Sequence, residues 1–513
     1  MPKGEAIDLA LALDRAGGRR LPLGQQLADE LRRRVQAGSL GPGERLPPVR
    51  TLAERLAVTP ETVANAYRRL VEEGYLRGEV GRGTFVAAPP LRAEEDLLAP
   101  FEAGGALPPF SSPSPSAAPA QRDLLRLASQ PGVVSFAASV AAPELAPVDA
   151  LRGALADVLE QEGGAALQVG ATSGYPPLRG AIAALLAERG LHATAEQVCV
   201  TSGCQQGIDL AAKVFVGPGD AVLVEQPSFL GALEAFRARG ARVVGVPIEG
   251  DGLRVDALPS LIQRYRPKLL YCMPAFQNPT GRSLSSGKRR ALLRVAASFD
   301  LPIVEDDSAG FFGLDGVAPA CLKAEDQAGY VIHLGTFSKL IAAGLRLGWL
   351  VAEPPVFEKL VAAKYASDLS SDALVQRAVH RLLVEGVLLS HLERVRLAYR
   401  ERRDTLVEAL RAHGFEQFTV PAGGFNVWLE LAADGPTATE LYLEAIRRGV
   451  AFVPGPFFFS ASGTASATAV RSLRLSYSAL GPGALQRGVE LMSESLRALQ
   501  NDTVRTRAAS VVY

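Results

Sequence analysis

A lysine set among hydroxyl and cationic side chains is the strongest chemical signal in this sequence of 513 residues. Lys339 stands in the stretch GTFSKLIAAGLRLGW, with Thr336 three residues before it, Ser338 directly before it and Arg346 seven residues after it. A lysine amine forms an imine with an aldehyde, while hydroxyls and an arginine suit a phosphate. The combination predicts a site for pyridoxal 5'-phosphate (PLP), bound as an imine on Lys339.

Two further residues match the polar atoms of the PLP ring. The pyridine nitrogen must stay protonated for the ring to act as an electron sink, so a carboxylate has to face it. Asp306 ends the apolar run LPIVEDD and is the candidate, with an N-cap at a strand-to-helix turn as its alternative role. The adjacent Asp307 is expected to be structural. Asn278 in FQNPTG would donate a hydrogen bond to the phenolic oxygen of the ring.

The phosphate and the ring face need a helix N-terminus and an aromatic platform. The stretch TSGCQQGIDLAAKVF predicts a helix whose first amides, near Gly203, Cys204 and Gln205, would bind the phosphate. Phe229 in EQPSFLG would stack on the ring, although an isolated phenylalanine is more often a core residue.

The carboxylate of an amino compound calls for an arginine that binds it through two parallel hydrogen bonds. Arg474 in LRLSYSAL is the candidate and Arg471 its competitor, and either could instead be a surface charge. Residues 423–426 are expected to border the same pocket.

Short apolar runs that end in polar or glycine residues indicate the strands that position these groups. They alternate with helical patterns from about residue 125 onward, which predicts βαβ units and a mostly parallel sheet buried on both faces. Ligands of such sheets bind outside the carboxyl ends of the strands, where the candidate residues stand. The predicted strands are VCVTSG, AVLVEQP, ARVVGVP, KLLYCMP, LPIVEDD, VIHLGTFSK and RLGWLVA.

The first part of the chain has a different pattern, with three short helices. Leucines recur at helical spacing from residue 23, a second helix is expected over residues 49–56, and Thr59 before Pro60 marks the start of a third that ends near Glu73. The third helix is expected to bury Val63, Tyr67, Leu70 and Val71.

The opposite face of the third helix carries short polar and basic residues that suit the major groove of DNA, beside one acid: Glu61, Thr62, Asn65, Arg68 and Arg69. The segment YLRGEVGRGTFV then predicts a β-hairpin with Arg82 at a glycine-rich tip, which suits the minor groove. The first 90 residues hold 14 basic and 11 acidic side chains, a mild excess that permits this role.

Composition predicts a multidomain chain in the cytoplasm. We expect a DNA-binding domain at residues 18–88, an extended proline-rich linker at 89–124 and a PLP domain at 125–503. The four cysteines lack metal-type spacing and fit a reducing compartment, and no metal site is expected. No apolar run reaches membrane-spanning length, and acids at Glu5, Asp8 and Asp14 argue against a signal peptide.

Residues 21–86 resemble the winged helix-turn-helix of the GntR family across its length. The motifs SGCQQ, QPSF, QNPTG, EDD, SK...R and RLSY, in this order, resemble fold-type I, class I aminotransferases. Together the two parts resemble the MocR subfamily of PLP-dependent regulators. The resemblance implies an α+β head, an α/β PLP domain with a small C-terminal α+β subdomain, and a homodimer. It also implies that Arg50, Thr59 and Thr62 lie at the DNA, with Gly83 in the wing, while Pro60 departs from the basic residue that the family often has.

Two tyrosines of the aminotransferase pattern are missing. Ser308 or Ala309 stands where a tyrosine usually bonds the phenolic oxygen of PLP, and Val169 stands where one usually reaches the partner subunit's phosphate, with Tyr175 as a nearby substitute. Both losses leave imine exchange possible but weaken the case for efficient transamination.

Two functions remain open at this point. In the first, the chain is a transcription regulator that uses PLP to sense an amino compound or PLP itself. In the second, it is a working aminotransferase with a DNA-binding head. The head and the linker favour the first, because a metabolic enzyme needs neither. The sequence names neither the effector nor the promoter.

Overall fold

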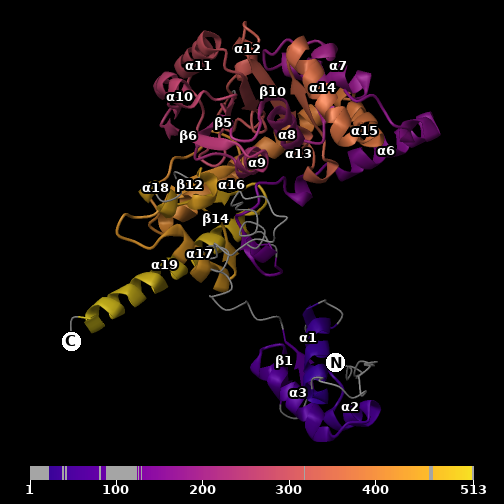
Figure 1. Cartoon of the computed structure of the whole chain (residues 1–513), viewed down its shortest axis with the longest axis vertical. Helices are drawn as coiled ribbons and strands as arrows, with labels where there is room; N and C mark the ends of the chain where they lie inside the picture. The colour runs from indigo at the N-terminus through magenta and orange to yellow at the C-terminus, as the bar shows by residue number, and fades with distance from the viewer. Residues whose placement is uncertain are drawn as a thin grey trace. The chain divides into compact units, whose positions relative to one another are not determined.

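The computed structural model describes residues 22–36, 40, 43–79, 83–87, 124, 126–128, 130–316, 318–460 and 466–510. The chain divides into two compact units, residues 1–104 and 105–513 (Figure 1). The linker predicted at 89–124 lies outside the described residues, except for Leu124. None of the helices in the described part has the length and apolar character that crossing a bilayer requires.

The first unit is a three-helix head followed by a hairpin. Its elements are α1 (Leu23–Gln36), α2 (Val49–Leu56), α3 (Pro60–Glu72), β1 (Leu76–Glu79) and β2 (Gly83–Val86). Thr59 caps α3, since its Oγ1 accepts a hydrogen bond from the amide of Thr62 at 3.2 Å, and Pro60 takes the first helical position. The predicted bounds of α2 and the predicted start of α3 are therefore confirmed.

The core of the head differs from the prediction at one position. Val63, Tyr67 and Leu70 of α3 are buried as expected, but Val71 is 41% exposed and the prediction for it was wrong. Ala66 is buried in its place. At about 100° per residue, Val71 turns away from the stripe that begins at Val63, whereas Ala66 stays on it.

The wing is an antiparallel pair in which Leu76 lies opposite Val86 and Glu79 opposite Gly83. The segment before α2 extends it, because the amide of Leu46 donates to the carbonyl of Thr84 at 2.9 Å. Residues 80–82, and with them the predicted tip residue Arg82, lie outside the described residues.

The second unit is built on one eight-stranded sheet with the order β4-β11-β10-β9-β8-β5-β6-β7. Strands β6, β5, β8, β9 and β10 run parallel, whereas β11 is antiparallel to both of its neighbours. All seven predicted strands are found in it, as β4 (Val198–Thr201), β5 (Ala221–Gln226), β6 (Arg242–Glu249), β8 (Leu270–Cys272), β9 (Ile303–Asp306), β10 (Val331–Thr336) and β11 (Gly348–Val351), and β7 (Gly252–Leu253) completes it.

Helices surround this sheet, some in contact with it and others packed on neighbouring helices (Figure 1). They are α6 (Val148–Glu162), α7 (Pro176–Ala187), α8 (Cys204–Phe215), α9 (Leu230–Ala238), α10 (Leu258–Tyr265), α11 (Ser286–Phe299), α12 (Leu322–Glu325), α13 (Phe337–Leu340), α14 (Pro354–Asp368) and α15 (Ala373–Val384). Short 3-10 turns connect them, namely η1 (Pro143–Leu145), η2 (Gly163–Leu167), η3 (Ala195–Gln197), η4 (Val255–Ala257) and η5 (Ala343–Leu345).

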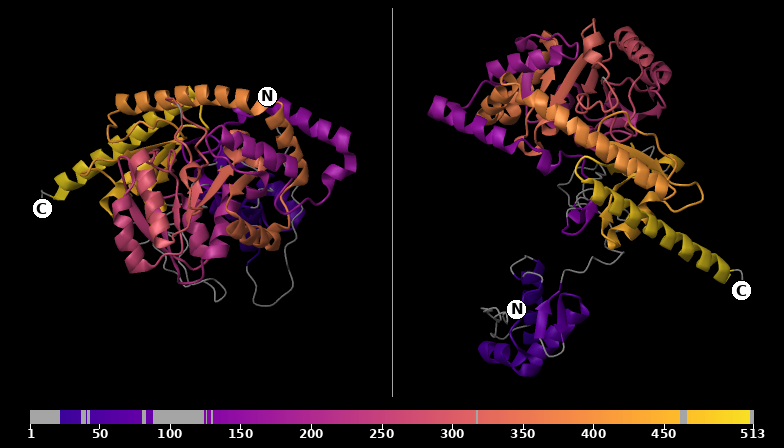
Figure 2. Two further views of the ribbon diagram at one scale, coloured as in Figure 1. Left: turned by 90° about the horizontal axis from the view of Figure 1, so that it is seen from above. Right: turned by 180° about the vertical axis from the view of Figure 1, so that it is seen from behind.

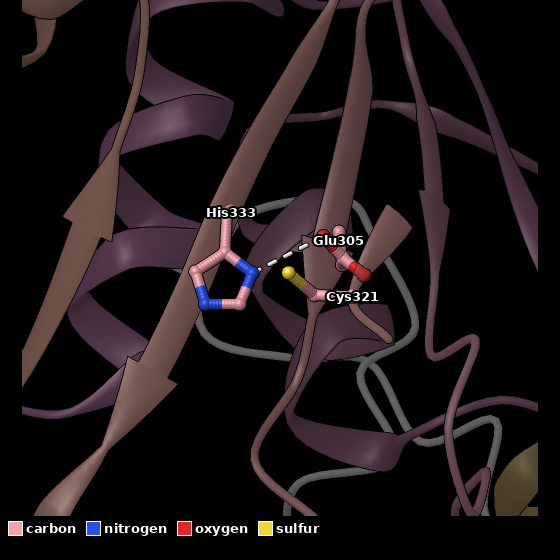
Figure 3. A group of neighbouring side chains, drawn as sticks. All are labelled: Glu305, Cys321 and His333. Atoms are coloured by element: carbon pink, nitrogen blue, oxygen red, sulfur yellow. Dashed lines mark hydrogen bonds and ion pairs between the residues drawn. The ribbon is translucent and has the colours of Figure 1, made fainter. Parts of the chain in front are cut away.

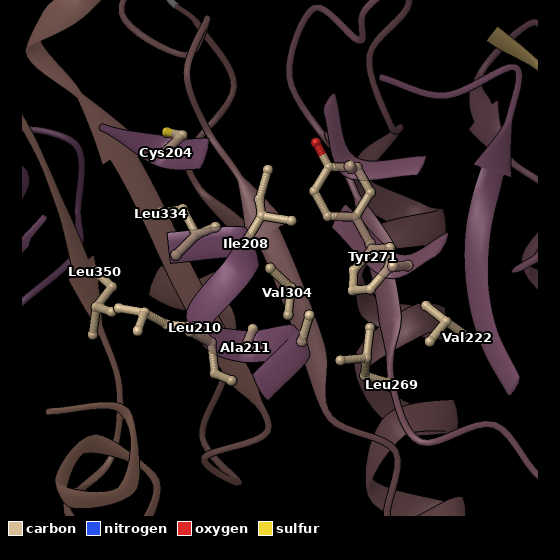
Figure 4. Close-up of a cluster of buried hydrophobic side chains, with 14 of the residues drawn as sticks. Cys204, Ile208, Leu210, Ala211, Val222, Leu269, Tyr271, Val304, Leu334 and Leu350 are labelled. Atoms are coloured by element: carbon tan, nitrogen blue, oxygen red, sulfur yellow. The ribbon is translucent and has the colours of Figure 1, made fainter. Parts of the chain in front are cut away.

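Helix α8 lies directly on the sheet (Figure 4). Its Ile208 and Ala211 join Val304 of β9 and Leu334 of β10 in one buried cluster. A Cβ at Gly207 would lie 2.7 Å from the Leu334 side chain, so only glycine allows this approach. The close packing brings the N-terminus of α8 to the carboxyl ends of β9 and β10.

A smaller α+β part completes the second unit, as the resemblance implied. Its sheet has the order β12-β15-β14, and β3 (Val134–Ser135) pairs in parallel with β13 (Val450–Ala451). Helices α16 and α19 lie side by side (Figure 2). The remaining elements are α16 (Val387–Ala412), β12 (Asn426–Glu430), α17 (Ala438–Arg447), β14 (Val453–Pro454), η6 (Gly455–Phe458), α18 (Ala467–Arg471), β15 (Ser472–Ser476) and α19 (Pro482–Ser510).

Candidate functional site

A pocket of about 470 Å³ opens at the carboxyl ends of the parallel strands, where such sheets bind ligands. Strands β9 and β10 end in it at Asp306 and Thr336, and α13 begins beside it. The structure brings together nearly all of the predicted site residues as its lining: Cys204, Gln205, Phe229, Asn278, Asp306, Thr336, Ser338, Lys339, Arg346 and Arg474. Gly203 does not line the pocket but lies next to Arg346, because a Cβ on it would meet the guanidinium at 3.2 Å.

Lys339 extends from α13 into this pocket. The turn that carries it is fixed by Thr336, whose Oγ1 accepts a hydrogen bond from the amide of Ser338 at 3.1 Å. The Nζ of Lys339 donates to the carbonyl of Ser139 and lies 5.8 Å from the centre of the Phe425 ring. Burial, followed by the positive charge of Arg474, lowers the pKa of Lys339 to about 8. About a tenth of this lysine is therefore a neutral amine at about pH 7, and this is the form that reacts with aldehydes.

Asp306 is held as a buried acceptor at the end of β9. The hydroxyl of Tyr271 donates to its Oδ2 at 2.8 Å, and the amide of Ser308 donates to its Oδ1 at 3.0 Å. The second bond is the local turn-capping role considered as an alternative, so Asp306 caps the turn and also lines the pocket. Tyr271 was missed by the sequence reasoning. The sequence pattern that could have identified it is a single phenol in the apolar strand KLLYCMP, because a buried hydroxyl needs a hydrogen-bond partner.

Asp307 has a different role from its neighbour. Its carboxylate forms a buried ion pair with Arg189, which also donates to the carbonyl of Pro319 at 2.9 Å. Asp307 does not line the pocket. It is structural, as expected.

A buried group of three potential metal ligands lies just outside the pocket (Figure 3). Side-chain atoms of Glu305, Cys321 and His333 lie within 4.8 Å of one another. Both oxygens of Glu305 already accept hydrogen bonds, from the first amides of α12 and from His333 Nδ1 at 3.1 Å. The carboxylate therefore ties β9 to α12 and β10, and it holds the strand end that presents Asp306.

The phosphate end of the pocket combines a helix N-terminus with a cation. Helix α8 starts at Cys204, and Gly203 before it has φ 90°, a conformation that suits glycine. Arg346 has only neutral partners among the described residues, the hydroxyl of Ser338 at 3.4 Å and the carbonyl of Ser202 at 3.2 Å. Unused amides and an arginine without an acidic partner fit a phosphate dianion.

Arg474, on β15, lies at the other end of the pocket. It is 7% exposed, and it donates to Asn278 Oδ1 at 3.1 Å and to the carbonyl of Ala137. Burial lowers the pKa of its guanidinium to about 10. Arg471 does not line the pocket and donates to the carbonyls of Ala432 and Gly435, so Arg474 stays the candidate for the carboxylate. Of residues 423–426, only Phe425 lines the pocket.

Of the two positions that lack the expected tyrosine, the first lies at the pocket and the second lies at the surface. Ser308 and Ala309 both line the pocket, and no tyrosine is among the described residues that do so. Val169 is 79% exposed. Tyr175, the nearby substitute, has its ring on the guanidinium of Arg377 at 4.6 Å and against His380.

The head presents most of its predicted DNA contacts to solvent. Arg50, Thr59, Asn65, Arg68, Arg69 and Gly83 are exposed and Thr62 is half-buried. Arg68 donates to Asn65 Oδ1 at 3.1 Å, whereas Arg69 pairs with Glu73 at 2.8 Å. Gly83 has φ 119°, which favours glycine at the start of β2.

The sequence matches two family models. The aminotransferase class I and II family matches residues 135–491, and the GntR family of bacterial regulatory proteins matches residues 23–86. The probable rhizopine catabolism regulatory protein MocR of Rhizobium meliloti is 30% identical over 502 residues, which are 96% of this chain and 97% of that protein. The chain belongs to the MocR-type regulators.

The second unit of this MocR-type chain also has enzyme relatives. The 2-aminoadipate transaminase of Thermus thermophilus is 40% identical over 385 residues, which are 74% of this chain and 94% of that protein. The crystal structure of LysN, an alpha-aminoadipate aminotransferase of that organism complexed with N-(5'-phosphopyridoxyl)-L-leucine, is 38% identical, covers 74% of this chain and 95% of that one, and has a TM-score of 0.68. The cofactor of this family is PLP, and the pocket residues fit it.

Proposed function

We propose that this chain is a DNA-binding transcription regulator that senses an amino compound, or PLP itself, in the pocket around Lys339. One observation carries the proposal: a GntR-type head stands in the same chain as a pocket that keeps the reactive lysine and has no tyrosine among the described residues of its lining. A sensor needs the lysine to hold the cofactor but does not need the phenols that tune rapid turnover.

The pocket residues have distinct tasks in this proposal. PLP would supply an aldehyde group that reacts with primary amines, and Lys339 would hold it in the pocket. Asp306 would hold a proton at the pyridine nitrogen, and Asn278 would donate to the phenolic oxygen. Arg346 and the first amides of α8 bind the phosphate. Arg474 binds the carboxylate of the effector.

The segment of residues 134–140, called the strap here, supports a coupling between ligand binding and DNA binding. The carbonyl of Ala137 accepts from Arg474, and the carbonyl of Ser139 accepts from Lys339 Nζ. Both donors are the side chains that a ligand engages, so ligand binding competes with the strap for them. Further toward the N-terminus, Leu124 also lines the pocket, at the end of the predicted linker. The contacts of the strap would therefore differ between the ligand-free and the ligand-bound state, as an allosteric change requires.

A homodimer is part of the proposal. Exposed apolar residues support it: Leu167 and Val169 in and after η2, and Val384 at the end of α15, are 62%, 79% and 62% exposed. Helix α15 packs against both α6 and η2, so these side chains belong to neighbouring elements. Apolar exposure of this kind suits a surface between subunits. Sedimentation of the full chain tests it, and a monomer at micromolar concentration would contradict it.

An active aminotransferase is the second candidate. The 40% identity to a 2-aminoadipate transaminase and the lowered pKa of Lys339 favour it. Purified PLP-loaded protein, given an amino donor and a keto acid, separates the two candidates. The regulator proposal expects amino compounds to change the affinity for promoter DNA with little turnover. Turnover at the rate of a dedicated aminotransferase, without a change in DNA affinity, would favour the enzyme.

A further inference from the structure

A second cavity, of about 560 Å³, lies between α16 and the loop that follows β9. It shares no lining residue with the pocket around Lys339, yet one loop borders both spaces. Ser308 and Ala309 line the first pocket, whereas Gly310 and Phe311 line this cavity. A ligand in the cavity would therefore contact the loop that presents Ser308 and Ala309 to the PLP site.

Two arginines of α16 line the cavity from the same side of the helix. Arg396 and Arg400 are one turn apart, so their side chains are neighbours. The Nε of Arg396 donates to the carbonyl of Phe311 at 2.8 Å. The Nε of Arg400 donates to the carbonyl of Leu314 at 2.7 Å. Among the described residues, neither arginine has an acid as ion-pair partner, and the two terminal nitrogens of Arg396 have no hydrogen-bond acceptor.

The charges around this arginine pair favour an anion. Arg189, the third arginine of the lining, is already paired with Asp307. Burial lowers the pKa of Arg396 and so does the charge of Arg189, while Glu393 acts in the opposite direction. Glu188, which is exposed, is the one acid among the described residues that line the cavity. An anion between the arginines would relieve the repulsion between their charges.

The rest of the cavity suits an apolar group. Phe311 and Leu392 are buried, Leu389 is 45% exposed, and all three line the cavity. A Cβ at Gly310 would lie 2.5 Å from Nη1 of Arg189, so glycine leaves the room that this wall needs. Apolar surface beside a few polar donors is the usual composition of a small-molecule site.

We propose that this cavity binds a small phosphate monoester with an apolar body. Two guanidinium groups offer more N–H donors than one carboxylate accepts, whereas a phosphate brings three oxygens and close to two negative charges. The phosphate binds Arg396 and Arg400, and the body packs on Phe311, Leu389 and Leu392. The site is separate from the PLP pocket, so the inference does not depend on the proposed sensing function.

Calorimetric titration of the full chain, loaded with PLP and reduced with borohydride, tests the ligand class. The reduction keeps the PLP pocket occupied, so the probes cannot bind at its phosphate site. The probes are phenyl phosphate, benzoate and inorganic phosphate. Phenyl phosphate is expected to bind at least about 10-fold more tightly than benzoate, the lower end of the effect of a charge-assisted hydrogen bond. It is expected to bind at least about 3-fold more tightly than inorganic phosphate, since an aromatic contact contributes that much.

Each departure from this order contradicts a part of the proposal. Benzoate that binds as tightly as phenyl phosphate would overturn the assignment to phosphate. Inorganic phosphate that binds as tightly would overturn the role of the apolar wall. Absence of binding for all three probes would overturn the site.

Two variants test whether the probe binds in this cavity. Arg400→Met removes a cation and Leu389→Glu adds an anion, so each should weaken phenyl phosphate binding at least about 5-fold. Arg411→Met and Leu397→Glu, at exposed positions of α16 outside the cavity, are the matched controls. Circular dichroism checks that the variants fold. An affinity that neither cavity variant changes, or that the controls lower equally, would place the probe elsewhere and overturn the inference.

Discussion

The protonation state of Lys339 gives a quantitative test of the pocket electrostatics. Burial and the charge of Arg474 lower the pKa of Lys339 from 10.5 to about 8. At about pH 7.5 roughly a quarter of the side chain is then neutral, against roughly a thousandth for a lysine with its ordinary pKa. The amine in this pocket should therefore react with PLP on the order of 100-fold faster than an exposed lysine at that pH.

The assay is the rate of covalent PLP incorporation into the apoprotein, followed by absorbance between about pH 6 and about pH 10. Only the neutral amine attacks the aldehyde, so the rate should rise about tenfold per pH unit at low pH and level off above about pH 8. Arg474→Met removes a nearby positive charge, so it should raise the pKa of Lys339 and move the midpoint upward. Arg487→Met, an exposed arginine of α19 paired with Glu490, is the matched control.

Two results would refute this reasoning. A midpoint near the ordinary lysine pKa would show that burial and Arg474 do not act on Lys339 as the geometry requires. A midpoint that stays unchanged in Arg474→Met, while PLP still binds, would remove Arg474 as a cause and leave burial alone.

Three further predictions concern Lys339 and the DNA-binding head. Lys339→Ala should abolish the adduct that borohydride traps, with the circular dichroism of the fold retained, and a trapped adduct in this variant would refute the assignment. Arg50→Ala should weaken binding to all DNA sequences and lower the salt dependence by roughly one counterion, and an unchanged salt slope would count against a phosphate contact. Thr59→Ala removes the cap of α3 and should lower the free energy of unfolding of the head by about 1 kcal/mol, measured by denaturant titration. Thr51→Ala, within α2, is its control, and equal losses in both variants would argue against a capping role.

Most of the architecture could be predicted, because strands and helix starts leave local signals. The seven apolar runs became strands since each is short and bounded by turn residues, and all but KLLYCMP contain β-branched residues. The cap at Thr59 was visible for the same reason, as a hydroxyl residue followed by proline. The order of the strands in the sheet carries no such signal and came only with the structure.

The errors and omissions concern contacts that depend on the whole fold. Ala66 is buried in place of Val71, although their angular distances from the centre of the buried stripe of α3 differ by less than the rotation of one residue. The bond between Tyr271 and Asp306 joins neighbouring strands, whose pairing the sequence does not specify. Arg69 stays a predicted DNA contact, but the sequence did not indicate its ion pair with Glu73, which also binds Arg32 of α1. Local patterns identify which residues have suitable chemistry, whereas tertiary contacts decide which of them are available.

The distribution of retained and missing groups argues for sensing on physical grounds. The residues that we propose to hold PLP and to bind a carboxylate all line one pocket: Lys339, Asp306, Arg346 and Arg474. Of the two missing phenols, one would donate to the phenolic oxygen of PLP and favour the deprotonated imine, and the other would reach the partner subunit's phosphate. Lys339 and Arg474 both donate hydrogen bonds to the strap. In the proposed function, a ligand that engages these two side chains competes for them with the strap carbonyls, and this competition links ligand binding to the position of the strap. Catalysis does not require a coupling between Lys339 and the segment that leads in sequence toward the DNA-binding head. Regulation by a ligand does require such a coupling.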